Sequence, residues 1–154
     1  MCGTDTDRRF LLDVMCGKLA VYLRMCGHDA AYAGDRNVTD DDRLLVIADA
    51  ENRTLLTRDR ELAGRTEDAL LLAGTETTEQ LRELADSGIP LELDDAPAHC
   101  GRCNGRVDAV DPESKTPAYA PDPAAVDCFR CRSCGQVFWK GSHWNRVERT
   151  LEDV

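Results

Sequence analysis

Long hydrophobic runs, lysines and large aromatic residues are scarce in this chain of 154 residues. No apolar stretch approaches the roughly 20 residues that a membrane-spanning helix needs, so the sequence predicts no membrane protein. Phe, Trp and Tyr make up 5% of the residues, and the lysines are Lys18, Lys115 and Lys140. No signal-peptide pattern is recognised, so we expect a cytoplasmic protein whose thiols stay reduced.

Acidic residues outnumber basic ones by 29 to 19, which gives a formal net charge of -10 at pH 7. A surface rich in aspartate and poor in lysine predicts a halophilic protein, since acidic groups keep a chain hydrated in a salt-rich cytoplasm; an ordinary acidic protein is the alternative. The acidic balance argues against nucleic acid as a partner, because such binding usually needs a basic patch. At high salt the Debye length falls to about 3 Å, so repulsion is screened and RNA is not excluded.

Four of the eight cysteines form two Cys-x2-Cys pairs near the end of the sequence. Cys100 and Cys103 form the first pair, Cys131 and Cys134 the second, and 27 residues, 104 to 130, separate them. Four thiolates in two such turns are the ligand set of a tetrahedral, structural zinc site. Two disulfides are the alternative, which a reducing cytosol disfavours. The sequence therefore predicts a zinc ribbon.

The residues after each pair support this assignment. Asn104-Gly105 and Gly135 suit the left-handed backbone that a metal-binding turn needs. Cys128 forms a rival Cys-x2-Cys pair with Cys131, but Gly135 directly follows the pair that we prefer. The remaining cysteines, which have no metal-ligand spacing, are Cys2, Cys16 and Cys26.

Short apolar runs alternate with amphipathic segments in the first 95 residues or so. This alternation predicts the α/β fold class: a mainly parallel sheet flanked by helices, followed by the small C-terminal zinc ribbon. Residues 89–93 are either a last strand or an extended linker. We expect strands over 9–13, 28–33, 53–57 and 69–73, and helices over 17–25, 39–48 and 77–87.

Aspartates follow two of the predicted strands. Asp13 ends the first strand, Asp59 follows the strand over 53–57, and Asp41 and Asp42 open the helix between them. Parallel strands would bring these carboxylates to one edge of the sheet, where ligands bind in such folds. Magnesium or manganese prefers this kind of oxygen ligand and activates water for phosphodiester hydrolysis.

Simpler interpretations stay open for each acid except Asp13, which interrupts an apolar stretch. Asp41 and Asp42 suit a helix N-terminus and need be no more than caps. Asp59 lies between two arginines and suits a surface ion pair. Lys18, shortly after the first strand, suits a phosphate contact.

Three motifs resemble the Mut-seven C-terminal RNase family, over about residues 9 to 147. The opening motif is Phe10-Leu-Leu-Asp-Val-Met-Cys-Gly-Lys-Leu-Ala20, with Leu23-Arg24 and Gly27-His28-Asp29; the second is Leu55-Leu-Thr-Arg-Asp-Arg-Glu-Leu62; the third is the closing Cys-x2-Cys-Gly with Phe138-Trp-Lys-Gly-Ser-His-Trp144. Cys16 stands where the family often has leucine, and Cys128 is an addition.

The resemblance implies a PIN-like RNase domain over 8–96, a zinc ribbon over 97–147 and metal-dependent cleavage of RNA. It places Asp13, Asp41 and Asp59 at the acidic positions that hold magnesium or manganese. The family's helix-start motif has an acid seven residues before an alanine, and with Ala48 as that alanine the acid is Asp41. The further candidates are Asp42, Asp35 as the fourth acid, and Lys18, Arg24 and Arg58 as catalytic or RNA contacts.

The segment after the last cysteine carries Trp139, Lys140, His143 and Trp144. Tryptophans stack on bases in proteins that bind single strands, so these residues are candidates for RNA contact. Packing of the ribbon onto the larger domain is the favoured alternative, because so small a module has little core of its own. For the whole chain, the leading hypothesis is an endoribonuclease of the PIN type. The alternative is a non-catalytic module that binds RNA or protein.

Overall fold

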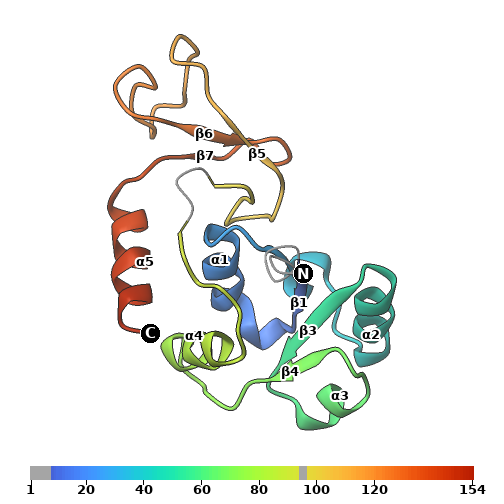
Figure 1. Cartoon of the computed structure of the whole chain (residues 1–154). Coiled ribbons are helices and arrows are strands. Elements are labelled where there is room, and N and C mark those ends of the chain that lie inside the picture. The colour runs from blue at the N-terminus through green and yellow to red at the C-terminus, as the bar shows by residue number, and fades with distance from the viewer. Residues whose placement is uncertain (1–7, 94–96) are drawn as a thin grey trace.

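A four-stranded parallel sheet forms the centre of the larger part of the molecule in the computed structural model, which describes residues 8–93 and 97–154 (Figure 1). The strand order is β2-β1-β3-β4, and neighbouring strands all run parallel. The strands are β1 (Arg9–Leu12), β2 (Asp29–Tyr32), β3 (Arg53–Thr57) and β4 (Ala69–Leu71). The predicted α/β fold with a parallel sheet is confirmed.

Helices cover both faces of this sheet, with α1 and α4 on one side and α2 and α3 on the other (Figure 1). The apolar run of β1 explains why both faces are buried. Phe10 and Leu12 point into the cluster under α1 and α4, whereas Leu11 points into the cluster under α2 and α3. Each fully buried leucine contributes roughly 2 kcal/mol to folding. The helices are α1 (Gly17–Met25), α2 (Asp41–Ala50), α3 (Arg60–Gly64) and α4 (Thr77–Asp86).

Two short 3-10 helices follow the first two strands. These are η2 (Val14–Cys16) and η3 (Ala33–Arg36). The sequence pattern did not reveal them, nor did it reveal α3. Residues 89–93 form no strand, so of the two alternatives the extended linker holds.

A small antiparallel sheet carries the cysteines. Its strands, in the order β5-β6-β7, are β5 (Val107–Ala109), β6 (Phe129–Cys131) and β7 (Val137–Phe138). Residues 110–128 join β5 to β6 through turns, without further helix or strand. The three strands form the expected ribbon.

The chain returns to the larger part after the ribbon. Helix α5 (Ser142–Glu152) runs back toward α4, so that its C-terminal end lies near that helix, and Leu151 and Val154 pack against the core beneath α1 and α4 (Figure 1). Arg82 of α4 donates a hydrogen bond of 3.2 Å to the carbonyl of Asp153. The boundary predicted at residue 147 thus falls within a helix that connects both parts.

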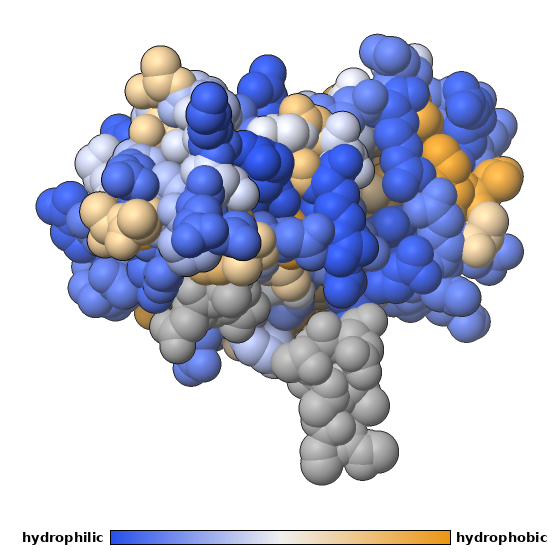
Figure 2. All heavy atoms as spheres, turned by 90° about the horizontal axis from the view of Figure 1, so that it is seen from above, coloured by the Kyte–Doolittle hydropathy of each residue, from blue (hydrophilic) through white to orange (hydrophobic). Residues whose placement is uncertain are grey.

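The face seen from the ribbon end is mostly hydrophilic, with apolar residues only in small groups (Figure 2). Within residues 8–93 and 97–154, no helix has both the length and the apolar character needed to cross a membrane.

Candidate functional site

Asp13 lies directly after β1, at the carboxyl edge of the parallel sheet. Its side chain is only 6% exposed. Oδ1 accepts a hydrogen bond of 2.7 Å from the amide of Val14, which caps η2, and Oδ2 accepts one of 2.8 Å from the hydroxyl of Thr57. The Asp13 amide bonds to the carbonyl of Leu56 at 3.0 Å, which extends the β1–β3 ladder to this residue. Both the backbone and the side chain of Asp13 are therefore fixed.

Asp59 follows the neighbouring strand β3 and caps helix α3. Its Oδ1 accepts hydrogen bonds from the amides of Glu61 at 3.0 Å and Leu62 at 3.2 Å. Its own amide donates to the Thr57 hydroxyl at 3.0 Å, so that one hydroxyl connects Asp59 to Asp13. Oδ2 of Asp59 accepts no hydrogen bond from the described residues, and Asp59 forms no ion pair with them. Asp59 therefore caps a helix through Oδ1 and does not form the surface ion pair that the sequence also suggested.

The surroundings of Asp13 fit a bound cation. In the part of the chain that the structure describes, no lysine, arginine or histidine forms an ion pair with this buried carboxylate. A buried charge without a partner is costly, whereas a hard divalent ion with oxygen ligands would neutralise it.

Asp41 and Asp42 occupy the first turn of α2, and Asp40, not either of them, is the N-cap. The Asp40 side chain accepts a hydrogen bond of 3.1 Å from the Asp42 amide. Asp42 forms an exposed ion pair with Arg65, and hydrogen bonding to Asp42 raises the pKa of that arginine. Asp41 is exposed and accepts no hydrogen bond from the described residues. Helix α2 packs on β3 and ends shortly before that strand begins, so its first turn, with Asp41, lies toward the carboxyl end of β3.

The three carboxylates share an edge but do not form a tight cluster. Among the described residues, the only group of three or more potential metal ligands within 4.8 Å of one another is the set of four cysteines. The topology thus brings Asp13, Asp41 and Asp59 to one region without bringing their oxygens into mutual contact.

Two exposed cations are candidates for phosphate contact. Lys18 lies close to Asp13 in the chain, and Arg58 acts on the same thiol as Asp13. Lys18 is in the first turn of α1, directly after η2. The position of Arg58 is indicated by Cys16: burial, and then the charge of Asp13, raise the pKa of this thiol to about 11, while the charge of Arg58 opposes the rise. Both Asp13 and Arg58 therefore act on Cys16 in η2.

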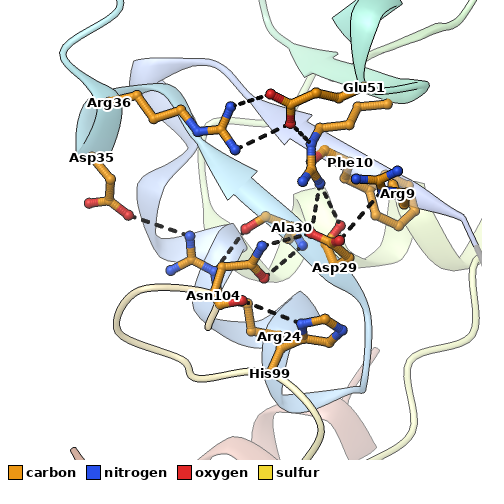
Figure 3. Close-up of polar contacts among 11 residues, drawn as sticks. Arg9, Phe10, Arg24, Asp29, Ala30, Asp35, Arg36, Glu51, His99 and Asn104 are labelled. Atoms are coloured by element: carbon orange, nitrogen blue, oxygen red, sulfur yellow. Dashed lines mark hydrogen bonds and ion pairs between the residues drawn. The ribbon is translucent and has the colours of Figure 1, made fainter. Parts of the chain in front are cut away.

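Asp35 and Arg24 pair with each other instead of facing the acidic edge separately (Figure 3). Arg24 is only 3% exposed, and its Nη2 lies 3.4 Å from Oδ2 of Asp35 in η3. Its Nε donates to the carbonyl of Ala30 at 2.8 Å, and its Nη1 donates to the carbonyl of Gly101 at 3.0 Å. Burial lowers the pKa of Arg24, although Asp35 opposes this. The guanidinium thus joins α1, β2 and the ribbon.

The predicted zinc ligands come together. Sγ of Cys100 lies 3.7 Å from Sγ of Cys134, and Sγ of Cys103 lies 3.5 Å from Sγ of Cys131. All four sulfur atoms lie within 4.8 Å of one another, which is the spacing that a single tetrahedral metal requires. This grouping confirms the preferred pairs. Cys128 is buried elsewhere, with its Sγ 3.4 Å from the carbonyl of Val126.

Backbone geometry prepares these thiols for a metal. Asn104 and Gly135 have left-handed φ angles of 70° and 78°, as predicted for the two turns. Amides of Ser133 and Cys134 donate to Sγ of Cys131 at 3.3 and 3.4 Å. Burial tends to raise the pKa of Cys131, but these amides and the neighbouring thiols outweigh it, and the pKa falls to about 7. The donor set therefore fits a thiolate-binding ion such as zinc.

The aromatic residues after the ribbon divide into two environments. Trp139 stacks on Tyr119 within the ribbon, with ring centroids 6.2 Å apart. Trp144 is half-buried at the start of α5, and the ammonium of Lys140 lies 5.3 Å from its ring centroid. His143 is exposed in the same turn. Packing within the ribbon thus explains Trp139, whereas Trp144 lines a groove between α1, the first cysteine turn and α5.

A polar network at the amino end of β2 went unnoticed in the sequence (Figure 3). Asn104 of the ribbon accepts a hydrogen bond from the Ala30 amide at 3.0 Å and donates to Oδ1 of Asp29 at 2.7 Å. Asp29 pairs with Arg53 at 2.7 Å, and Arg53 pairs with Glu51 at 2.7 Å. The quoted Gly27-His28-Asp29 motif was the one signal that could have pointed to it.

A parallel α/β sheet with carboxylates at its carboxyl edge, joined to a ribbon whose four cysteines could hold a metal such as zinc, defines a two-part protein. The chain belongs to the Mut7-C RNAse domain family, whose model matches residues 8–151. The resemblance seen in the sequence is confirmed over nearly the whole chain, and it indicates a ribonuclease-type or RNA-related function. Comparison with curated proteins and with solved structures gives no match.

Proposed function

We propose that this protein is a metal-dependent ribonuclease that hydrolyses phosphodiester bonds of RNA at the carboxyl edge of its parallel sheet. The observation that carries the proposal is Asp13, a buried carboxylate that forms no ion pair with any described residue, in a chain of an RNase-domain family. Two hydrogen bonds stabilise this carboxylate, and a bound cation would in addition balance its charge.

Asp13 and Asp59 are the proposed ligands of Mg²⁺ or Mn²⁺, with Asp41 as the third. When bound, the ion would activate water and stabilise the charge that develops on the phosphate. Thr57 holds the Asp13 carboxylate and the Asp59 backbone in place through two hydrogen bonds. Asp42 and Asp35, the further candidate acids, are each already paired with an arginine.

The exposed cations Lys18 and Arg58 are the proposed phosphate contacts, because Lys18 follows the short helix that Asp13 caps and Arg58 acts, like Asp13, on Cys16 in that helix. Arg24 contributes by fixing the ribbon, since its guanidinium is buried among protein acceptors. The four cysteines are proposed to hold a structural zinc, which supplies folding energy to a module with little core of its own. A cytoplasmic location is proposed with it, because a reducing compartment would keep these thiols available for the metal.

A non-catalytic module that binds RNA or protein is the second candidate. The absence of a tight carboxylate triplet among the described residues favours it. The pairing of Asp42 with Arg65 favours it too, because it engages one acid of the edge.

Cleavage of single-stranded RNA by the zinc-loaded protein tests the proposal. We expect activity that requires Mg²⁺ or Mn²⁺ and that Asp13→Asn abolishes while the protein stays folded. Asp49→Asn is the matched control, because Asp49 is an exposed carboxylate near the far end of α2. Full activity in Asp13→Asn, or cleavage without divalent metal, would show that the acidic edge is not the site. A folded wild type that cuts no RNA would favour the binding module.

A further inference from the structure

A groove opens where α1, the first cysteine turn and the start of α5 meet, away from the acidic edge. Its volume is about 420 Å³, within the roughly 300–1,000 Å³ typical of small-ligand sites. Its lining is mostly apolar and aromatic, with polar groups at a few points. The residues that argue for a ligand are His99, Arg102, Gln136, Phe138, His143 and Trp144.

Two aromatic rings from different elements face this groove. Phe138 belongs to β7 and Trp144 to the first turn of α5, and both are half-buried. Val21 and Met25 of α1 complete an apolar wall. Flat aromatic surfaces beside an apolar wall suit a planar ring, because stacking on a base is sequence-tolerant and contributes about 1–3 kcal/mol.

Fixed polar groups stand beside the rings. Nη1 of Arg102 donates to Oε1 of Gln136 at 2.9 Å, which orients both side chains. Nδ1 of His99 lies 3.4 Å from the carbonyl of Asn104, so Nε2 is left without a partner among the described residues. These groups can form hydrogen bonds with the edge of a heterocyclic base, where donors and acceptors alternate.

The charge of the groove contrasts with that of the chain. Although acidic residues outnumber basic ones by 29 to 19, the described residues that line the groove include no aspartate or glutamate. Arg102 lies on the lining, and Lys140 places its ammonium over the Trp144 ring. The groove can therefore accept an anionic ligand, although the chain as a whole is acidic.

We propose that this groove holds an unpaired base of a single-stranded RNA, with the adjoining phosphate near Arg102 and Lys140. The inference rests on the proposed ribonuclease function and adds a substrate class, because only a base outside a duplex can enter such a groove. The ribbon and α5 then form a second contact for the strand whose cleavage the acidic edge performs.

The two tryptophans of the chain provide a direct probe. Trp139→Phe leaves Trp144 as the sole tryptophan, and Trp139 itself stacks on Tyr119. This variant, combined with Asp13→Asn to prevent cleavage, is titrated with a ten-nucleotide single-stranded RNA in buffer without Mg²⁺ or Mn²⁺. We expect quenching of the Trp144 fluorescence, and much less quenching with the blunt duplex or with an abasic strand of equal length.

Affinity provides the second readout. Trp144→Leu should weaken binding of the same RNA about tenfold by fluorescence anisotropy, and Trp144→Phe should restore most of it. Circular dichroism and zinc content establish that the variants are folded; if Trp144→Leu fails to fold, the quenching experiment decides alone. Binding without quenching, or an unchanged Kd in folded Trp144→Leu, overturns the inference. Quenching in the Trp139→Phe, Asp13→Asn variant, together with a wild type that cleaves no RNA, would support the groove and overturn only the ribonuclease.

Discussion

The hydroxyl of Thr57 donates a hydrogen bond of 2.8 Å to the carboxylate of Asp13, across the ends of two neighbouring parallel strands. Because Thr57 also accepts the amide of Asp59, a single fully buried hydroxyl sets the relation between the two acids that the sequence places at the strand ends. The candidate site therefore depends on a residue that carries no charge.

Replacing Thr57 tests this dependence. Thr57→Val keeps the shape but removes the hydroxyl, so the buried Asp13 oxygen and the Asp59 amide lose a partner. We expect the free energy of unfolding to fall by about 2 kcal/mol and RNA cleavage to fall with it. Thr57→Ser retains the hydroxyl and is the control. Urea unfolding and initial cleavage rates measure the two effects, and an unchanged cleavage rate in folded Thr57→Val would refute the positioning role.

The assignment of the zinc ligands makes a second prediction. Cys131→Ser should release the metal and unfold the ribbon, because Cys131 Sγ lies within the four-sulfur group. Cys128→Ser should keep one zinc per chain, because Cys128 lies outside that group. Metal analysis of the purified variants gives the answer. Zinc lost from the Cys128 variant but retained in the Cys131 variant would reverse the assignment.

Gly105 makes a third prediction about the same centre. A Cβ at Gly105 would lie 2.8 Å from Cys131 Sγ and 2.7 Å from Ser133 Oγ, which is too close. Gly105→Ala should therefore weaken zinc binding about tenfold, as measured by competition with a chelator. Gly101→Ala is the matched control in the same cysteine turn, where the nearest contact is an ordinary 3.5 Å to Val21. Equal affinities in the two variants would contradict the packing argument.

The contact between the ribbon and the sheet makes a fourth prediction. Asn104→Gly keeps the left-handed backbone but removes the bonds to Asp29 and to the Ala30 amide. We expect a loss of about 2 kcal/mol in the free energy of unfolding. Asn37→Gly is the control, because Asn37 also has a left-handed φ but is exposed. If both variants lose the same stability, the side-chain bonds of Asn104 contribute nothing.

The lowered pKa of Glu51 predicts how the free energy of unfolding changes at acidic pH. Hydrogen bonds from Arg36, followed by those from Arg53, lower the pKa of Glu51 from 4.5 to about 2 against the opposing effect of burial. A lowered pKa means that the stabilisation is complete above the unfolded value near 4.5 and is lost as the pH falls toward 2. Glu51→Gln should flatten the pH dependence of unfolding in this window. A wild-type slope in Glu51→Gln would exclude the contribution.

Local pattern was enough to predict the parallel sheet and the group of four cysteines. The apolar run before Asp13 predicts a buried strand that ends in a carboxylate, and the spacing of the cysteine pairs predicts the metal centre. Both signals lie within a few residues in sequence, where side-chain periodicity and ligand spacing are directly visible.

The contacts that join the two parts could not be predicted in this way. Arg24 and Gly101 are 77 residues apart, and the match between one guanidinium and one carbonyl leaves no periodic trace. Arg24 thus suggested an RNA contact until its burial was seen. Helix α3 was missed because it spans only Arg60–Gly64, and its cap, Asp59, stands between arginines that suggested an ion pair.

The hydrogen bonds between Asn104 and β2 also protect the edge of the sheet from pairing with other molecules. Strand β2 lies at the edge of the parallel sheet, and such an edge offers its free amides and carbonyls to strands of other molecules. The Asn104 side chain occupies the Ala30 amide, and Arg24 occupies the Ala30 carbonyl. The turn that carries Cys100 and Cys103 therefore also shields this edge of the sheet, and a chain in which that turn unfolds would expose a template for aggregation.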